Sequence, residues 1–227
     1  MPFLEIMGEK KAKEIKHPRT PEERILNAAT EEFAAKGFFG ARTQAVANAA
    51  GVNKAMLHYY FQSKENLYSE VIKAAFGKIL REVSQAWLNP GDLENRLEVV
   101  IDSYIDNYRN NPGFLKIVLR EVADGGKGFR RAFRGTGKDQ SPASYFTPVE
   151  MVNRVASELG LSITGAVHMI INIVGMCAIS FVSPLFLEAV LRMDISDFEA
   201  YLQERRAAIK AMALAYARGL ASPTPKE

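Results

Sequence analysis

Apolar residues recur along this chain at intervals of three and four, which is the spacing of an α-helix. Ile25, Ala29 and Phe33 form one such stripe, and they predict a helix from about residue 21 to 36 that ends at Gly37. No segment alternates apolar and polar residues for long enough to indicate a strand. The pattern predicts an all-α protein, with further helices at about 92–110, 112–123, 129–133 and 148–159.

Two short helices joined by a glycine turn are predicted after the first helix. We expect Thr43 to cap the second helix and Asn53 to cap the third, which buries Leu57 and Phe61 and runs to about Tyr60. Gly51 stands between them, where a tight turn requires a positive φ. This spacing indicates a helix-turn-helix over about residues 42–61, although a plain helical hairpin has a similar pattern.

A long fourth helix is predicted from Lys64 to about Leu88, with Ser63 as its cap and Asn89-Pro90-Gly91 as its end. The chain then divides by pattern into four parts. They are an N-terminal arm that we expect to be flexible (1–20), a helix-turn-helix domain (21–75), a helical domain (76–221) and a tail (222–227).

Charge is distributed unevenly. Residues 1–64 contain 10 Lys and Arg against 7 Glu, whereas the rest of the chain contains 19 basic and 19 acidic residues. The 28 residues from Gly37 to Lys64 contain no carboxylate. A surface that faces a polyanion has this composition, although chance and partial burial also produce such runs.

Residues 24–72, about a fifth of the chain, read "RILNAATEEFAAKGFFGARTQAVANAAGVNKAMLHYYFQSKENLYSEVI". This segment contains several separate marks: Phe33, Lys36-Gly37, Thr43, Ala50-Gly51-Val52, Tyr59, Phe61 and Lys64. With these marks it resembles the N-terminal DNA-binding domain of TetR-type transcriptional regulators. Two positions depart from the family pattern, Ala55 and Met56, and both fall where base edges would be approached.

The resemblance implies a three-helix DNA-binding domain followed by a helical-bundle domain for ligand binding and dimerisation. The third helix would enter the major groove of double-stranded DNA, and two copies would read a palindromic operator. His58 is expected to reach a base or a phosphate, or to be simply solvated, and Tyr60 is expected at a phosphate or in partial packing. The full set of expected DNA contacts is Arg42, Thr43, Asn53, Lys54, Ala55, His58, Tyr59, Tyr60 and Lys64.

The 29 residues from Leu159 to Leu187 contain no Asp, Glu, Lys or Arg. Such a run is long enough to span a bilayer, but it contains His168 and Asn172 and has no basic cluster at either end. A helix apolar on all sides is also expected where one face is buried against a partner subunit. The resemblance implies a homodimer through the last two long helices, about 162–192 and 195–220, and no membrane insertion.

The resemblance also implies that the second domain holds an effector pocket. A mostly apolar cavity with a few polar groups suits a small apolar or amphipathic molecule. Tyr104 and Met176 could instead be ordinary core residues. His168 and Asn172 could instead form hydrogen bonds with each other or with a partner subunit. The candidate lining residues are Trp87, Tyr104, Tyr108, Arg120, His168, Asn172 and Met176.

The sequence gives little support for catalysis, metal binding or nucleotide binding. The three histidines lie in separate predicted regions, no metal-ligand spacing or nucleophile motif occurs, and no cofactor is expected. "GTGKD" at 135–139 lacks the Ser or Thr and the strand that a phosphate loop requires. Cys177 is expected to be an inert buried thiol, and one cysteine fits a cytoplasmic protein. We therefore expect a regulator, by family default a repressor; the alternatives are a membrane-associated or adaptor protein, or a small-molecule enzyme.

Overall fold

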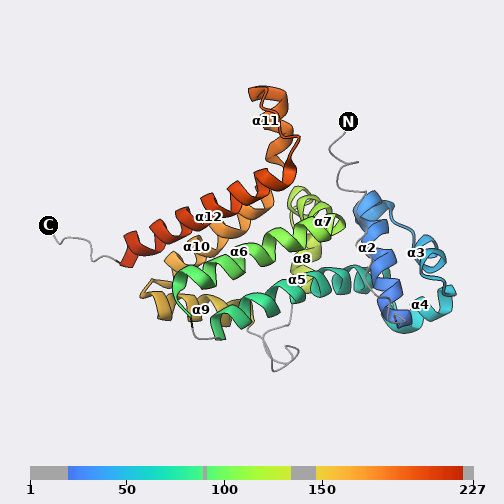
Figure 1. Cartoon of the computed structure of the whole chain (residues 1–227). Helices are drawn as coiled ribbons and strands as arrows, with labels where there is room; N and C mark the ends of the chain where they lie inside the picture. The colour runs from blue at the N-terminus through green and yellow to red at the C-terminus, as the bar shows by residue number, and fades with distance from the viewer. Residues whose placement is uncertain (1–19, 89–90, 134–146, 222–227) are drawn as a thin grey trace. The chain divides into compact units, whose positions relative to one another are not determined.

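The computed structural model describes residues 20–88, 91–133 and 147–221, and these residues form helices and connecting segments without a strand (Figure 1). The expected arm, the "GTGKD" loop and the tail lie outside the described residues, apart from Thr20. The chain divides into two compact units. Of the described residues, one unit contains 20–77 together with 111–133, and the other contains 78–88, 91–110 and 147–221.

The first unit is built from α2 (Pro21–Gly40), α3 (Thr43–Ala50), α4 (Lys54–Phe61), the first half of α5 (Lys64–Leu88), α7 (Pro112–Ala123) and α8 (Lys127–Ala132). Its core buries Ile25, Ala29 and Phe33 of α2 against Leu57 and Phe61 of α4. The apolar stripe and the inward pair expected from the sequence are therefore confirmed.

One expectation about helix ends in this unit was right and one was wrong. Gly37 has φ +69° and ψ 175°, which are not helical values, so the regular helix that begins at Pro21 ends there as expected, and a further turn after this kink extends α2 to Gly40. Thr43 does not cap α3, because it is already the first helical residue, and the N-cap residue Arg42 forms no side-chain capping bond. The cap predicted at Ser63 is confirmed, since its hydroxyl accepts a hydrogen bond from the Asn66 amide at 3.1 Å.

In the first unit α7 packs against α2, although α7 follows α6 in the chain. The two helices lie close together at Gly113, where a Cβ would stand 3.4 Å from the Ala34 Cβ. The segment 111–133, expected by pattern in the second domain, thus packs with the helix-turn-helix. That the first domain binds DNA, and that the second binds an effector and dimerises, remains a prediction.

The second unit contains the end of α5 together with α6 (Leu93–Asn110), α9 (Pro148–Leu159), α10 (Ile163–Ile179), α11 (Ser183–Leu191) and α12 (Phe198–Ala221). α10 packs against α6, α9 and α12, and α12 packs against α6. The helix expected over about 162–192 is broken: α10 ends at Ile179, and α11 begins at Ser183 after a turn.

Ion pairs join α6 to α12 along the surface of the second unit. Arg206 of α12 pairs with Asp102 and with Asp106 of α6, the latter at 2.6 Å, and Lys210 pairs with Glu98 at 2.7 Å. These pairs fix how α12 lies along α6. No single helix in the described ranges is long and apolar enough to cross a membrane; α9 and α10 together pass that test only as a pair bent by 110°.

Candidate nucleic-acid interface and effector pocket

The turn between α3 and α4 has the geometry that the sequence predicts. Gly51 caps α3 with φ +64°, in the left-handed region that favours glycine. The Val52 amide then donates to the Ala47 carbonyl at 3.0 Å, which closes the turn. Ala47 itself is completely buried, so its small side chain fits the packed centre of this unit.

Helix α4 is short, capped and divided sharply into two faces. Asn53 accepts a hydrogen bond from the Met56 amide at 2.7 Å, which confirms the predicted cap. Leu57 and Phe61 are buried, whereas Tyr59 is 81% exposed. An exposed tyrosine of this degree has little packing role, so the outward face of α4 is available to a partner. That face consists of Lys54, Ala55, Met56, His58, Tyr59 and Tyr60, all exposed.

The N-terminus of α5 lies beside the C-terminal end of α2. The Lys64 ammonium donates to the Phe39 carbonyl at 3.3 Å and stands 5.0 Å from the centre of the Phe38 ring. Lys64 and Thr43 are half-buried, and Arg42 is exposed. Phe39, which the sequence analysis did not single out, is 83% exposed. Phe39, whose carbonyl accepts the hydrogen bond from Lys64, is therefore exposed in addition to Tyr59 and Tyr60.

The last acidic residue before the run from Gly37 to Lys64 is paired with a lysine. Glu32 accepts hydrogen bonds from the Lys36 ammonium at 2.9 Å and from the Arg42 amide at 3.0 Å. The Lys36 bond, helped by the Arg42 amide, lowers the pKa of the Glu32 carboxyl below its ordinary value. Its charge is therefore compensated, and the run from Gly37 to Lys64 brings no carboxylate of its own.

Residues 25–71 match the family model for bacterial regulatory proteins of the tetR family. This chain has the N-terminal domain of a TetR-type regulator. The transcriptional repressor NicS of Pseudomonas putida is 31% identical over 97 residues, which cover 43% of this chain and 46% of NicS. The regulator RutR of Escherichia coli is 44% identical over 66 residues, which are 29% of this chain and 27% of RutR. The matches thus span less than half of either relative.

The whole chain also resembles solved structures. SCO4942 of Streptomyces coelicolor superposes with a TM-score of 0.57 at 22% identity, over 85% of this chain and 98% of that one. At this identity the likeness concerns the fold alone. It agrees with the predicted all-α fold, in which a helix-turn-helix domain is followed by further helices.

A buried carboxylate holds the first half of α5 to α7 and α8 in the first unit. We call this unit the TetR-type unit below, because it contains the matched residues 25–71. Glu121 of α7 is 5% exposed and accepts three hydrogen bonds. The donors are the Tyr68 hydroxyl at 2.9 Å, the Gly128 amide at 2.7 Å and the Phe129 amide at 3.2 Å. Burial and the Glu121 carboxylate raise the pKa of Tyr68, so its hydroxyl keeps the proton that it donates.

The seven residues expected to line an effector pocket belong to two units. Arg120 belongs to α7 in the first unit, where its guanidinium donates to the Ala35 carbonyl of α2 at 3.0 Å. The other six are in the second unit.

The six residues of the second unit have different surroundings. Trp87 is buried beneath the Arg96 guanidinium, 5.2 Å from its ring centre. Tyr104 and Tyr108 are neighbours with ring centres 6.3 Å apart, and burial raises the pKa of Tyr104 to about 12. His168 and Asn172 are exposed on α10, and Met176 is half-buried. The histidine and asparagine therefore face out of their own unit.

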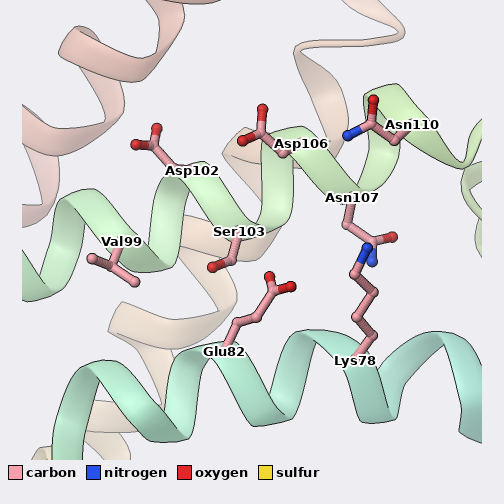
Figure 2. Close-up of a pocket in the computed structure, with 8 residues that line it drawn as sticks. All are labelled: Lys78, Glu82, Val99, Asp102, Ser103, Asp106, Asn107 and Asn110. Atoms are coloured by element: carbon pink, nitrogen blue, oxygen red, sulfur yellow. The ribbon is translucent and has the colours of Figure 1, made fainter. Parts of the chain in front are cut away.

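A pocket of about 270 Å³ lies between the second half of α5 and α6. Figure 2 shows Ser103 and Asn107 extending from α6 toward α5, while Glu82 and Lys78 extend from α5 toward them. Ser103 and Asn107 are at most 9% exposed, so the floor of the pocket is polar. The remaining lining residues are Val99, Asp102, Asp106 and Asn110. None of the seven residues expected from the sequence lines this pocket.

Within the described ranges, no three His, Cys, Asp or Glu side chains are grouped so that they could hold a metal ion. Cys177 is completely buried, and burial raises the pKa of its thiol to about 12. A thiol with this pKa is protonated at neutral pH and reacts slowly. The structure agrees with the expectation of an inert buried cysteine.

Proposed function

We propose that this protein is a ligand-responsive transcriptional regulator that binds a palindromic operator as a homodimer. The observation that carries this proposal is the capped helix α4, which directs Lys54, His58 and Tyr59 outward from a TetR-type helix-turn-helix. In such a motif this helix enters the major groove with its N-terminal residues toward the bases. The site of action would be the cytoplasm, and repression is the family default.

Roles for the interface residues follow from their positions. Lys54, in the first turn of α4, would reach a guanine edge or a phosphate, and Ala55 and Met56 would contact thymine methyl groups. Tyr59 and Tyr60 would set their hydroxyls on phosphate oxygens. Arg42, Thr43, Asn53 and Lys64 stand at the starts of α3, α4 and α5, where backbone amides favour phosphate.

Selection of bound DNA from a random pool tests the core of this proposal. We expect a palindromic consensus with half-sites about one DNA turn apart. A dimer that neutralises roughly six to eight phosphates should lose affinity with salt at a log–log slope of about −5 to −7. Recovery of no consensus, together with salt-independent retention, would contradict DNA-binding regulation.

The contribution of His58 can be separated from simple charge effects. His58→Ala that changes the preferred sequence indicates base reading, and a uniform loss of affinity indicates a phosphate contact. Lys73→Ala is a matched control for substitutions at Lys54, because Lys73 is a partly exposed lysine of α5 paired with Glu70 at 2.8 Å. We expect the control to leave the operator affinity and its salt slope unchanged.

The effector is proposed to bind in the second unit and to favour the conformation that does not bind DNA. Only the difference between its affinities for the two conformations can act as a switch. The sequence favoured an apolar or amphipathic effector, but the α5–α6 pocket is lined by Lys78, Glu82, Asp102 and Asp106. Asp102 and Asp106 already pair with Arg206, which leaves Glu82 as the carboxylate that could pair with a ligand. We therefore extend the search for effectors to polar molecules, including those with one positively charged group.

Variants of this pocket distinguish effector binding from DNA binding. Glu82→Gln should weaken release by a polar cationic effector while leaving effector-free operator affinity unchanged, because Glu82 lies outside the TetR-type unit. Metabolites that release the DNA are found by screening the complex with fluorescence anisotropy. Equal release of the wild type and Glu82→Gln would place the effector in another cavity.

A further inference from the structure

Helix α11 is anchored only near its first turn. The Ser183 hydroxyl lies 2.6 Å from the Tyr201 hydroxyl of α12, and Pro184 is buried. Just before the helix, Phe181 is buried against Tyr108 and Phe198. Beyond this base, α11 projects from the helices of its own unit (Figure 1).

The projecting part of α11 exposes an apolar face. Leu185 is 52% exposed, and Phe186 and Val190 are each 57% exposed. With Ala189 between them, these residues lie within about 140° of one another around the helix axis. The only charged residue of the helix, Glu188, lies outside this arc. The face is therefore uninterrupted by charge.

Further apolar side chains are exposed on the neighbouring segments. Met193 follows α11 and is 50% exposed, and Ile171 and Ile179 of α10 are 60% and 49% exposed. Side chains of this size, each with about half its surface in water, expose on the order of 100 Å² apiece. Together the six named side chains of α10, α11 and Met193 expose roughly 600 Å², about three-quarters of the roughly 800 Å² per partner that a stable protein interface buries.

We propose that α11 is an arm that packs its apolar face onto a second copy of this chain, next to the α10 and α12 faces of the dimer. The inference rests on the proposed homodimer and adds to it a distinct contact by α11, which is a separate helix where one long helix over about 162–192 was expected. A lipid surface fits less well. Membrane-surface helices carry Lys and Arg on the polar side, whereas α11 carries Glu188 and has no basic residue before Arg192.

Charge placed on the arm tests the proposal in the full-length protein. Phe186→Glu should raise the dimer dissociation constant by at least about 100-fold, since a symmetric dimer buries two copies of this side chain. Sedimentation over a wide range of protein concentration measures the constant. Glu188→Lys is the matched control: it changes charge on the same helix outside the apolar face, and the dissociation constant should change by less than about threefold.

Thiol labelling gives a second measurement that does not depend on disrupting the dimer. The chain has one cysteine, and Cys177 is completely buried, so Val190→Cys introduces the accessible thiol. Its alkylation by iodoacetamide should be at least about tenfold slower above the dimer dissociation constant than below it, because the partner covers it. Cys introduced at Glu188 should react at the same rate in both conditions.

The outcomes separate this inference from the proposed function. A dimer that survives Phe186→Glu, with Val190→Cys labelled at equal rates throughout, overturns the arm while leaving dimerisation intact. A chain that stays monomeric at every concentration overturns both. Concentration-independent protection of Val190→Cys, or its protection only by anionic lipid vesicles, also overturns the arm, because the face would then be covered by something other than a second copy.

Discussion

Removal of the Glu121 carboxylate should destabilise the TetR-type unit by about 3 to 5 kcal/mol. Glu121→Ala leaves the Tyr68 hydroxyl and the amides of Gly128 and Phe129 without their acceptor in a buried site. A hydrogen bond to a charged group contributes about 1.5 to 3 kcal/mol, and buried donors that lose their acceptor also retain a desolvation cost. The three losses overlap because they share one acceptor, so the total stays below their sum.

Milder substitutions at the same site should destabilise the unit less than Glu121→Ala does. Tyr68→Phe removes one of the three bonds and should cost about 1.5 to 3 kcal/mol. Gly128→Ala keeps all three groups but would place a Cβ 2.5 Å from Glu121 Oε1 and 2.6 Å from Tyr68 Cε1. Overpacking of this kind costs about 1 to 3 kcal/mol. Lys116→Ala, on the exposed side of the same helix, should change stability by less than about 0.5 kcal/mol.

Urea denaturation at a fixed protein concentration measures these differences, because dimerisation makes apparent stability depend on concentration. The double variant Tyr68→Phe/Glu121→Gln tests the contact directly: the two changes should couple by about 1 to 2 kcal/mol. If the two effects add without coupling, or if Glu121→Ala is no worse than Lys116→Ala, then the carboxylate does not hold α5 to α7 and α8 as described.

Four further changes test other parts of the structure. Lys64→Ala should weaken binding to all operators alike and reduce the salt slope by about one unit, measured by anisotropy titration; a changed consensus would argue for base contact instead. Asn53→Ala removes the cap of α4 and should cost about 1 kcal/mol in urea denaturation, with unchanged stability counting against the cap. Gly37→Ala should cost at least about 1 kcal/mol, because φ is +69° and the new Cβ would lie 2.8 Å from Arg120 Nη1; a stabilised variant would contradict this strain. Above pH 9 the unfolded chain loses the Cys177 proton, while the folded chain, with a thiol pKa of about 12, keeps it. The free energy of unfolding should therefore fall by up to about 1.4 kcal/mol per pH unit, and it should fall less steeply with pH in Cys177→Ala.

Features that depend on neighbouring residues in the chain could be predicted from the sequence. The α3–α4 turn is one example, since Gly51 adopts the positive φ that its position required and Asn53 caps the following helix. The division of α4 into a buried face with Leu57 and Phe61 and an exposed face with His58 and Tyr59 follows from helical periodicity alone. These are short-range effects, so the local order of residues is sufficient to specify them.

Predictions failed where the outcome depended on packing or on backbone geometry. Thr43 was expected to cap α3, but Arg42 is the last residue with an extended backbone, so Thr43 is already the first helical residue. The apolar run from Leu159 to Leu187 was expected within one long helix, yet it breaks after Ile179 and continues as the separate helix α11. Apolar composition does not indicate where such a run turns, because both helices are equally apolar.

The sequence by itself determined the helical class, the helix-turn-helix and which residues of α4 face outward, because periodicity and capping act within a few residues. Only the tertiary structure decided that Arg120 bonds the main chain of α2, that Glu121 joins Tyr68 to the start of α8, and that the α5–α6 pocket is polar. These contacts join residues far apart in the chain. No local pattern encodes them, since they depend on how whole helices pack.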